Sequence, residues 1–211
     1  MYYELATLTL PFGTAAQAAS NVQSWSNAPE AKANGAELLG CWFTDIGALN
    51  QMIVLRGFAD AASLATERER LQLAADPFGC GAIMQSLTVE SYRGFPWMAP
   101  VRPSDESGIR GPVYEIRTYG IKTGGVQPTL DLWREYVPAR HALSPCVIAM
   151  VALDGPLRFT NIWAYPSVDA RGKARAEAVA QGIWPPKGGP AWLTTSMTST
   201  IAAATAVSPL K

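Results

Sequence analysis

The residues best suited to chemistry lie in one short segment of the second half of the chain. Glu115, Arg117 and Tyr119 alternate along a run rich in β-branched and aromatic residues, so a strand would place all three on one face. A carboxylate, a guanidinium and a phenol could together hold an anion or move a proton. Because the other face is less charged and should meet helices, we expect these side chains to point into the enclosed interior. A buried Glu–Arg pair that only fixes strand packing is the alternative.

The single histidine is a second candidate for chemistry. His141 follows Pro138, Ala139 and Arg140 at the end of a predicted helix. A neutral imidazole could act as a general base or bind haem, and Arg140 could hold an anion. No haem-attachment motif accompanies the histidine, and a cation at a helix end is also explained by the helix dipole. The predicted catalytic residues are therefore His141 and Tyr119, with proton transfer as their role.

Aromatic side chains are concentrated in the same half of the chain. Trp184 opens the segment Trp184-Pro185-Pro186-Lys187-Gly188-Gly189-Pro190, which is too constrained to continue a helix. Such a loop could line the mouth of a cavity, and a rigid connector whose tryptophan fills the core is the alternative. The predicted ligand-binding set is Glu115, Arg117, Arg140, Trp163, Tyr165 and Trp184.

Two arginines occupy corresponding places in the two halves of the chain. Arg68 and Arg175 both fall on the apolar side of a predicted helix. An arginine that faces inward needs a partner, and Glu4 and Glu115, which also correspond, are candidates. We expect one structural Arg–carboxylate pair in each half, with anion binding as the alternative.

These correspondences belong to an internal repeat. The segment Tyr3-Glu4-Leu5-Ala6-Thr7 returns as Tyr114-Glu115-Ile116-Arg117-Thr118. The repeat predicts a first module at residues 1–97, a Pro-rich linker at 98–111 and a second module at 112–211. The first copy has Ala6 and Leu8 in place of Arg117 and Tyr119. We therefore expect a binding site to be built mainly from the second module.

Each module is predicted to run strand, helix, strand, strand, helix, strand. The first has strands at 2–10, 36–45, 49–58 and 85–93, a helix that follows Gly13, and a helix at 61–75. The second has strands at 112–121, 145–153, 157–165 and 192–202, and helices at 125–137 and 167–180. This order gives the ferredoxin-like arrangement, a four-stranded antiparallel sheet with both helices on one face. Because the bare sheet faces are apolar, we expect the modules to pack sheet on sheet as an α+β barrel.

Composition excludes several classes of function. The formal net charge is zero and only 16% of residues are charged, so neither nucleic acid nor an anionic membrane surface is an expected partner. No apolar run approaches the ~20 residues that span a bilayer and no signal-peptide pattern is present. We therefore expect no membrane insertion and a cytoplasmic location. The three scattered cysteines and the lack of nucleotide or zinc motifs predict no metal and no cofactor.

Several segments taken together resemble the NIPSNAP family of the dimeric α+β barrel superfamily. They are Val113-Tyr114-Glu115-Ile116-Arg117-Thr118-Tyr119, Leu132-Trp133-Arg134, Asp45-Ile46-Gly47-Ala48-Leu49-Asn50-Gln51, Ile162-Trp163-Ala164-Tyr165, Trp184-Pro185-Pro186 and Ser208-Pro209-Leu210. The resemblance covers both modules. It implies tandem ferredoxin-like modules, frequent oligomerisation, and a barrel lumen used for small molecules or protein contacts. Because the superfamily includes haem enzymes, cofactor-free monooxygenases and proteins without established activity, it implies no single reaction.

The leading hypothesis is a homo-oligomeric NIPSNAP-like barrel, most simply a homodimer, that binds a small, partly apolar molecule in its lumen. Oligomerisation is expected because low charge and 9% aromatic content leave apolar surface exposed. One alternative is a cofactor-independent enzyme of monooxygenase or isomerase type, with His141 or Tyr119 moving a proton. Another is a protein-interaction scaffold without a ligand. An open pocket with convergent polar groups would favour the first two.

Overall fold

The computed structural model describes residues 1–102 and 111–211 of the chain, so residues 103–110 of the predicted linker lie outside the described residues. The first module contains β1 (Tyr2–Thr9), α1 (Ala15–Ser26), α2 (Pro29–Ala33), β2 (Glu37–Ile46), β3 (Gln51–Phe58), α3 (Ala61–Leu73), the short 3-10 helix η1 (Pro77–Gly79) and β4 (Ser86–Gly94). The second contains β5 (Val113–Ile121), α4 (Val126–Leu143), β6 (Cys146–Ala152), β7 (Arg158–Tyr165), α5 (Val168–Ala180), the short 3-10 helix η2 (Gly189–Trp192) and β8 (Leu193–Ala204).

The strands form one closed antiparallel barrel in the order β1-β3-β2-β8-β5-β7-β6-β4. Within each module the first strand lies at the centre, since β1 pairs with β3 and β4, and β5 pairs with β7 and β8. Two junctions between the modules close the barrel, one between β2 and β8 and one between β4 and β6. The predicted fold, two ferredoxin-like modules packed as an α+β barrel, is confirmed.

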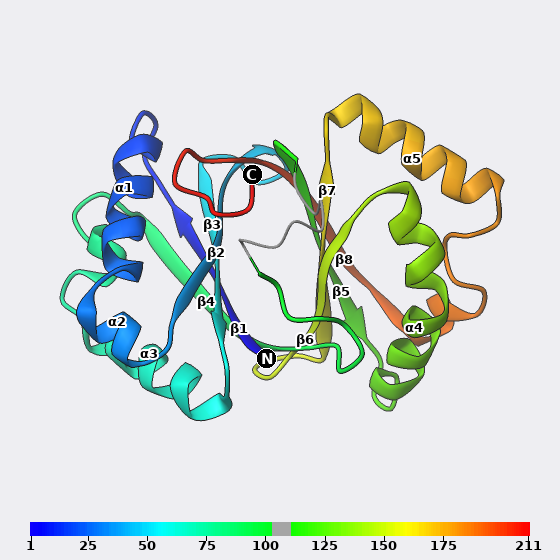
Figure 1. Cartoon of the computed structure of the whole chain (residues 1–211), viewed down its shortest axis with the longest axis horizontal. Helices are drawn as coiled ribbons and strands as arrows, with labels where there is room; N and C mark the ends of the chain where they lie inside the picture. Colours follow the sequence, from blue (N-terminus) through cyan, green and yellow to red (C-terminus); the bar gives the residue numbers. More distant parts are fainter. Residues whose placement is uncertain (103–110) are drawn as a thin grey trace.

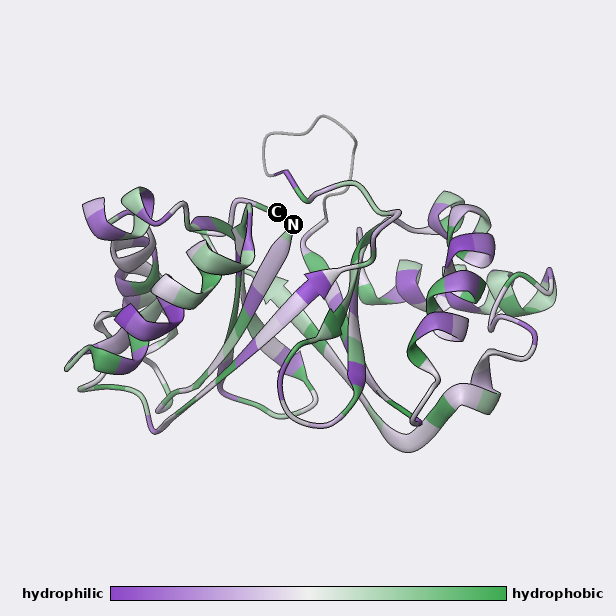
Figure 2. Ribbon diagram, turned by 90° about the horizontal axis from the view of Figure 1, so that it is seen from below, coloured by the Kyte–Doolittle hydropathy of each residue, from purple (hydrophilic) through white to green (hydrophobic). Residues whose placement is uncertain are grey.

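Helices cover the outside of the barrel on two opposite sides (Figures 1 and 2). Helices α1, α2 and α3 lie against the first module, and α4 and α5 lie against the second (Figure 1). The two modules therefore have separate helix–sheet cores outside the barrel and share a third core inside it.

The barrel interior is filled largely by apolar and aromatic side chains from both modules. Tyr3 and Tyr114, at equivalent places on β1 and β5, both point inward, and Trp42 packs on Tyr114 with ring centroids 4.9 Å apart. Inward polar groups pair with each other: the Tyr92 hydroxyl lies 3.0 Å from the Thr160 hydroxyl oxygen, and Arg158 donates to Glu90 at 2.7 Å. Both contacts join the two modules.

The alternation of β5 corrects one expectation. Because Tyr114 and Ile116 fill the barrel interior, Glu115, Arg117 and Tyr119 lie on the opposite face, beneath α4 and α5. The expectation that these three residues point into the lumen is wrong. Tyr114 and Ile116 pack in the apolar interior that the two modules share, and on the opposite face the Glu115 carboxylate pairs with Arg117 and with Arg171 of α5.

Two helices differ from the sequence prediction. Helix α4 continues through Pro138 to Leu143 although the predicted helix ends at residue 137. Proline removes one backbone hydrogen bond, but Trp133, Val137 and Arg140 are buried along one face and tertiary packing holds the last turns. The short helix α2 was not predicted at all.

Candidate ligand-binding site

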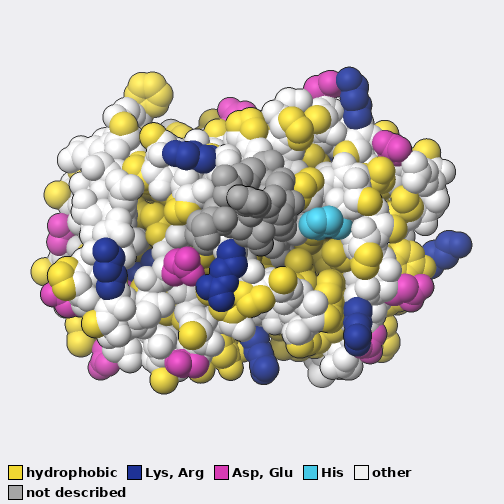
Figure 3. Space-filling model, in the orientation of Figure 1, with side chains coloured by type: hydrophobic (Ala, Val, Ile, Leu, Met, Phe, Trp, Pro, Cys, Tyr) yellow, Lys and Arg dark blue, Asp and Glu magenta, His cyan; other side chains and the backbone are white. Residues whose placement is uncertain are grey.

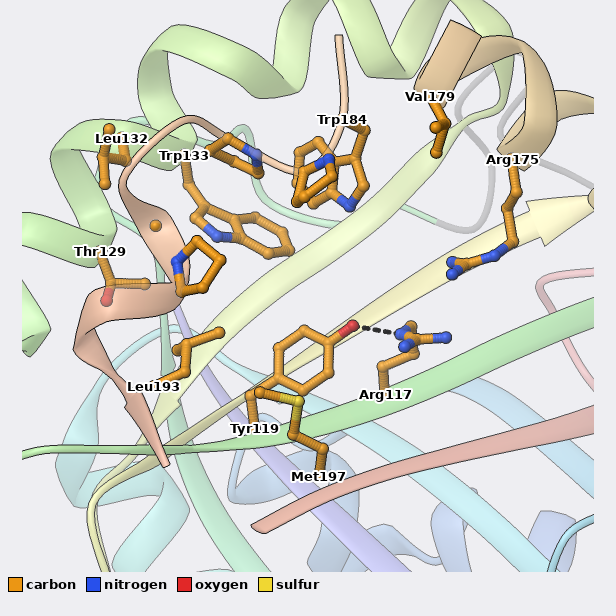
Figure 4. A pocket seen from close by; sticks show the side chains of 14 residues that line it. Arg117, Tyr119, Thr129, Leu132, Trp133, Arg175, Val179, Trp184, Leu193 and Met197 are labelled. Carbon is orange, nitrogen blue, oxygen red and sulfur yellow. Dashed lines mark hydrogen bonds between the residues drawn. The ribbon is translucent and has the colours of Figure 1, made fainter. Parts of the chain in front are cut away.

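A cavity of about 260 Å³ lies between the outer face of the second module's sheet and its two helices. Strands β5 and β8 form the floor, α4 and α5 form the roof, and the loop that leads from α5 into η2 closes one side (Figures 1 and 4). The lining residues are Arg117, Tyr119, Thr129, Leu132, Trp133, Arg175, Val179, Trp184, Pro185, Pro186, Gly189, Pro190, Leu193 and Met197.

The polar groups of the cavity gather at one end. Arg117 rises from β5 and its Nε donates a hydrogen bond to the hydroxyl of Tyr119 (Figure 4). Arg175 reaches from α5 toward the same end, so two guanidinium groups and one phenol converge there (Figure 4). The Arg117 guanidinium also donates to the Ser199 hydroxyl at 3.1 Å. This end of the cavity could therefore bind a hydrogen-bond acceptor or an anion of a ligand.

Glu115 lies behind this polar end and is fully buried. Its Oε1 lies 2.5 Å from Nη1 of Arg117 and 2.5 Å from Nη2 of Arg171, and it also accepts a 2.9 Å hydrogen bond from Ser199. Burial by itself would raise the pKa of Glu115, but the two arginines lower it to about 2. Burial acts to lower the pKa of Arg117, but its contacts with Tyr119 and Glu115 outweigh burial and raise that pKa. Both groups are therefore ionised at neutral pH.

The opposite end of the cavity is apolar and rigid. Trp133 of α4 and Trp184 of the loop meet edge to face, with ring centroids 5.0 Å apart. Trp163 packs behind Trp184 at 5.8 Å, and its Nε1 donates to Asn161 Oδ1 at 2.7 Å. Aromatic rings locked in this way give a planar molecule an apolar surface at little cost in conformational entropy.

The structure brings some of the predicted ligand-binding residues together at this cavity. Arg117, Tyr119 and Trp184 line it, and Glu115 holds Arg117 in place. Tyr165 does not line it, and its hydroxyl donates to Glu115 Oε2 at 3.3 Å. Trp163 likewise supports the wall from behind.

Arg140 and His141 do not line the cavity. Arg140 is buried, donates to the hydroxyls of Ser144 and Tyr165, and lies 4.7 Å from the centre of the Trp163 ring. His141 is exposed at the surface (Figure 3), and its Nδ1 accepts the backbone N–H of Cys146 at 3.1 Å. It lies eight residues beyond Trp133, or about 12 Å along the helix axis. Of the two predicted catalytic residues, Tyr119 lines the cavity and His141 does not.

The expected arginine pairs are also partly wrong. Arg68 is not buried against Glu4, and its Nη1 lies 3.9 Å from Asp154 instead. Glu4 pairs with Arg56 of β3, at 2.7 Å, and Glu67 of α3 lies 2.6 Å from the other side of the same guanidinium. The helix register places Glu67, and not Arg68, on the buried face.

Arg175 does pair with Glu115, as expected, but weakly. The two charged groups are 3.9 Å apart, and 38% of the Arg175 side chain is exposed. The close partner from α5 is Arg171, one helical turn earlier, which sequence reasoning missed. Arg171 lies four residues before Arg175 and therefore shares its helix face. That spacing was the feature of the sequence that could have identified Arg171 as a partner of Glu115.

Several apolar lining residues were also not predicted as part of a site. Trp133 lies within the helix predicted at 125–137, but nothing in the sequence indicated that it borders a cavity. Leu193 and Met197 come from β8, and only the closed sheet shows that they lie beside Tyr119, whose Cα pairs with that of Met197.

The corresponding space of the first module is packed with side chains. Ala6 and Leu8, which replace Arg117 and Tyr119, lie in a core with Ala18, Val22 and Phe78. The short helix η1 inserts Phe78 there, and this residue is fully buried. The asymmetry seen in the sequence therefore corresponds to a filled space in one module and a cavity in the other.

Neither a metal site nor a membrane-spanning helix is found in the part of the chain that the structure describes. Among residues 1–102 and 111–211, no three His, Cys, Asp or Glu side chains come together as possible metal ligands. None of the helices described has the length and hydrophobicity that a membrane span requires. Acidic and basic side chains are scattered over the face seen in Figure 3, without a basic patch.

Comparison with known proteins gives one family and one fold. The model of the NIPSNAP family matches residues 3–87 and 114–209. A curated relative, the protein NipSnap homolog of Dictyostelium discoideum, is 27% identical over 154 residues, which span 71% of this chain and 66% of the relative. The chain thus spans just under two thirds of that relative's length.

Solved structures show the same fold over nearly the whole chain. A Lactobacillus acidophilus protein assigned provisionally as a monooxygenase superposes with a TM-score of 0.64 at 13% identity, covering 96% of this chain and 93% of that one. An anthrone oxidase-like protein superposes with a TM-score of 0.62 at 11% identity, covering 97% and 91%. At these identities the likeness concerns the fold alone.

Proposed function

This chain belongs to the NIPSNAP family, and we propose that it binds a small, partly apolar molecule in the cavity between β5, β8 and the helices α4 and α5. This location replaces the barrel lumen expected from the sequence. One observation carries the proposal: the cavity has an apolar wall at one end and convergent polar groups at the other, which is the usual composition of a small-molecule site.

The size of the cavity limits the ligand. A volume of about 260 Å³ equals the liquid volume of roughly nine water molecules, so a ligand of on the order of ten heavy atoms would fit without rearrangement. The edge-to-face pair of Trp133 and Trp184 favours a flat, apolar body. The Tyr119 hydroxyl oxygen accepts a hydrogen bond from Arg117, so the hydroxyl hydrogen can be donated to an acceptor atom of the ligand.

A second candidate function is a cofactor-independent enzyme of monooxygenase or isomerase type. It is favoured by the position of Tyr119, whose phenol faces the cavity beside a guanidinium and could transfer a proton to a bound molecule. The two structural relatives named above, one provisionally a monooxygenase and one oxidase-like, add support by analogy of fold. His141 lies outside the cavity, so this mechanism would rest on Tyr119 and Arg117.

We also propose that the protein forms a homodimer. Strand β8 pairs with β2 only from Ile201 to Ala204, so within the described residues its segment 193–200 has one edge without a neighbouring strand. This segment carries no charge and no proline, the usual features that prevent edge pairing, and exposed Ile46, Leu49 and Met197 extend the surface.

Sedimentation tests the dimer. The wild-type chain should sediment at twice 22.6 kDa, and Thr195→Lys, which places a charge on the open edge, should sediment as a monomer. A wild-type protein of 22.6 kDa at micromolar concentration would contradict the proposal.

The cytoplasmic compartment expected from the sequence also remains a proposal. The three free, buried thiols fit a reducing environment.

Ligand binding is tested by native mass spectrometry together with calorimetric titration of a neutral probe, 2-naphthalenemethanol. We expect a retained molecule or measurable probe binding in the wild type, and loss of both in Leu193→Glu, which puts a carboxylate into the apolar wall. Leu157→Glu is the matched control, because Leu157 is exposed and lies outside the cavity. Absence of both a retained molecule and probe binding in the wild type would refute the proposal.

A further inference from the structure

We propose that the ligand of this cavity carries a carboxylate, which Arg117 and Arg175 bind, while its apolar body packs against Trp133 and Trp184. This inference rests on the proposed function and adds the chemical class of the ligand. It follows from an excess of positive charge at the polar end of the cavity and from the position of an arginine that the protein itself pairs only loosely.

The arginines at the polar end of the cavity outnumber the carboxylates that pair with them. Glu115 is the only carboxylate that pairs with Arg117, Arg171 and Arg175 in the described part of the chain. Three guanidinium groups thus share one carboxylate, and the cluster has a formal charge of plus two. These guanidinium groups are only partly in contact with water, and charges in that position are normally paired, so the polar end of the cavity favours an anionic ligand.

The hydrogen bonds of these arginines leave donors unused. Both short contacts of Glu115 Oε1 go to Arg117 and Arg171, which leaves Arg175 at 3.9 Å from Oε2, beyond hydrogen-bond distance. Nε of Arg171 is buried without a hydrogen-bond partner. The cluster therefore has more donors than acceptors. A ligand carboxylate would supply two acceptor oxygens in the planar geometry that guanidinium groups match.

The side chains that line the cavity separate its charged end from its apolar end (Figure 4). The Arg175 and Arg117 guanidinium groups both extend to the end of the cavity where the Tyr119 hydroxyl lies, and the indole rings of Trp133 and Trp184 lie at the other end (Figure 4). A molecule bound across the cavity would place its charged and apolar parts at opposite ends. A flat aromatic carboxylate satisfies both ends, whereas a neutral molecule would leave the positive charge without a counter-charge.

The experiment compares two probes that share one ring system. 2-Naphthoate carries the carboxylate, and 2-naphthalenemethanol is its neutral counterpart of similar size. We expect calorimetry at low ionic strength to show naphthoate binding about tenfold or more tightly, a difference of about 1.4 kcal/mol. Raising the ionic strength to about 1 M should weaken naphthoate binding and leave the neutral probe unchanged.

Substitution of Arg175 tests whether this arginine causes the difference in affinity between the two probes. Arg175→Gln should weaken naphthoate binding about tenfold and change binding of the neutral probe by less than about twofold. This variant should fold normally because the side chain is partly exposed and its ion pair is long. Arg68→Gln is the matched control, since it removes the corresponding arginine of the first module, which should leave both affinities unchanged. Arg117→Gln, checked for a normal melting curve, provides a second test.

The outcomes separate this inference from the proposed function. If both probes bind equally, or if Arg175→Gln and folded Arg117→Gln retain wild-type affinity for naphthoate, the carboxylate assignment is overturned while the cavity remains a binding site. If neither probe binds and no molecule is retained on purification, the proposed function itself fails.

Discussion

Replacing Glu115 by Gln should destabilise the fold strongly at neutral pH and much less in acid. Glu115 is fully buried and is the shared counter-charge of Arg117, Arg171 and Arg175. Glutamine keeps the shape of the side chain but removes the charge. Three guanidinium groups would then surround a neutral side chain in place of a carboxylate, which is the costly way to break a buried ion pair.

The magnitude follows from the pKa of Glu115, which falls from its ordinary value of 4.5 to about 2 in the folded protein. Each tenfold change in proton affinity corresponds to about 1.4 kcal/mol, so the folded state favours the ionised carboxyl by about 3 kcal/mol. For a chain of this length, such a loss lowers the melting temperature by roughly 6 to 12 °C.

The sign of the pH dependence follows from the direction of the shift. Because the pKa is lowered on folding, the stabilisation is fully present above pH 4.5 and is lost as the pH falls toward 2. The difference between wild type and Glu115→Gln should therefore be about 3 kcal/mol at pH 7 and should shrink to about 1 kcal/mol at pH 3.

Urea unfolding followed by circular dichroism at several pH values measures this difference directly. Glu177→Gln is the control, because Glu177 lies on the exposed side of α5 and its substitution should change stability little at any pH. A Glu115→Gln protein as stable as the wild type at pH 7 would refute the reasoning. So would a deficit that stays constant between pH 7 and pH 3, because the lost interaction would then not be that of a charge.

Two further predictions concern the first module. Arg56→Ala should lower the free energy of unfolding by about 3 to 5 kcal/mol, because it removes the cation that pairs with buried Glu4 and leaves Glu67 with Arg70 alone. Arg68→Ala should cost less than about 1 kcal/mol, and equal urea midpoints for the two variants would contradict this prediction. Burial raises the pKa of Cys41 to about 11. Its thiol should therefore react with iodoacetamide at pH 8 only when the protein is unfolded. Rapid labelling of the native protein would contradict this prediction, because it would show that the thiol is accessible.

The repeat was readable in the sequence because it is a local pattern. The alternation in Tyr3-Glu4-Leu5 and in Tyr114-Glu115-Ile116 predicts two equivalent central strands, and the structure pairs β1 and β5 in the same way with their neighbours. Element types and the closed barrel followed from hydrophobic periodicity and from sheet faces that were apolar on both sides. The module limits at residues 97 and 112 stay a prediction.

The location of the cavity was not readable in the sequence. Alternation showed that Glu115, Arg117 and Tyr119 share a face, but a period of two does not say which face meets the helices. The answer depends on side chains distant in the sequence, because Arg171 supplies the nearest counter-charge from α5 and Trp42 of the other module fills the interior.

The sequence by itself therefore determined the elements, their order, the repeat and the asymmetry between its copies, since each is set by the spacing of neighbouring residues. Tertiary structure alone decided that the polar strand residues line a helix–sheet cavity, that His141 lies outside it, and that Arg56, not Arg68, neutralises Glu4. The physical reason is that burial and pairing of charges depend on which distant side chains occupy the same space, and the spacing of residues along one strand or helix does not specify that.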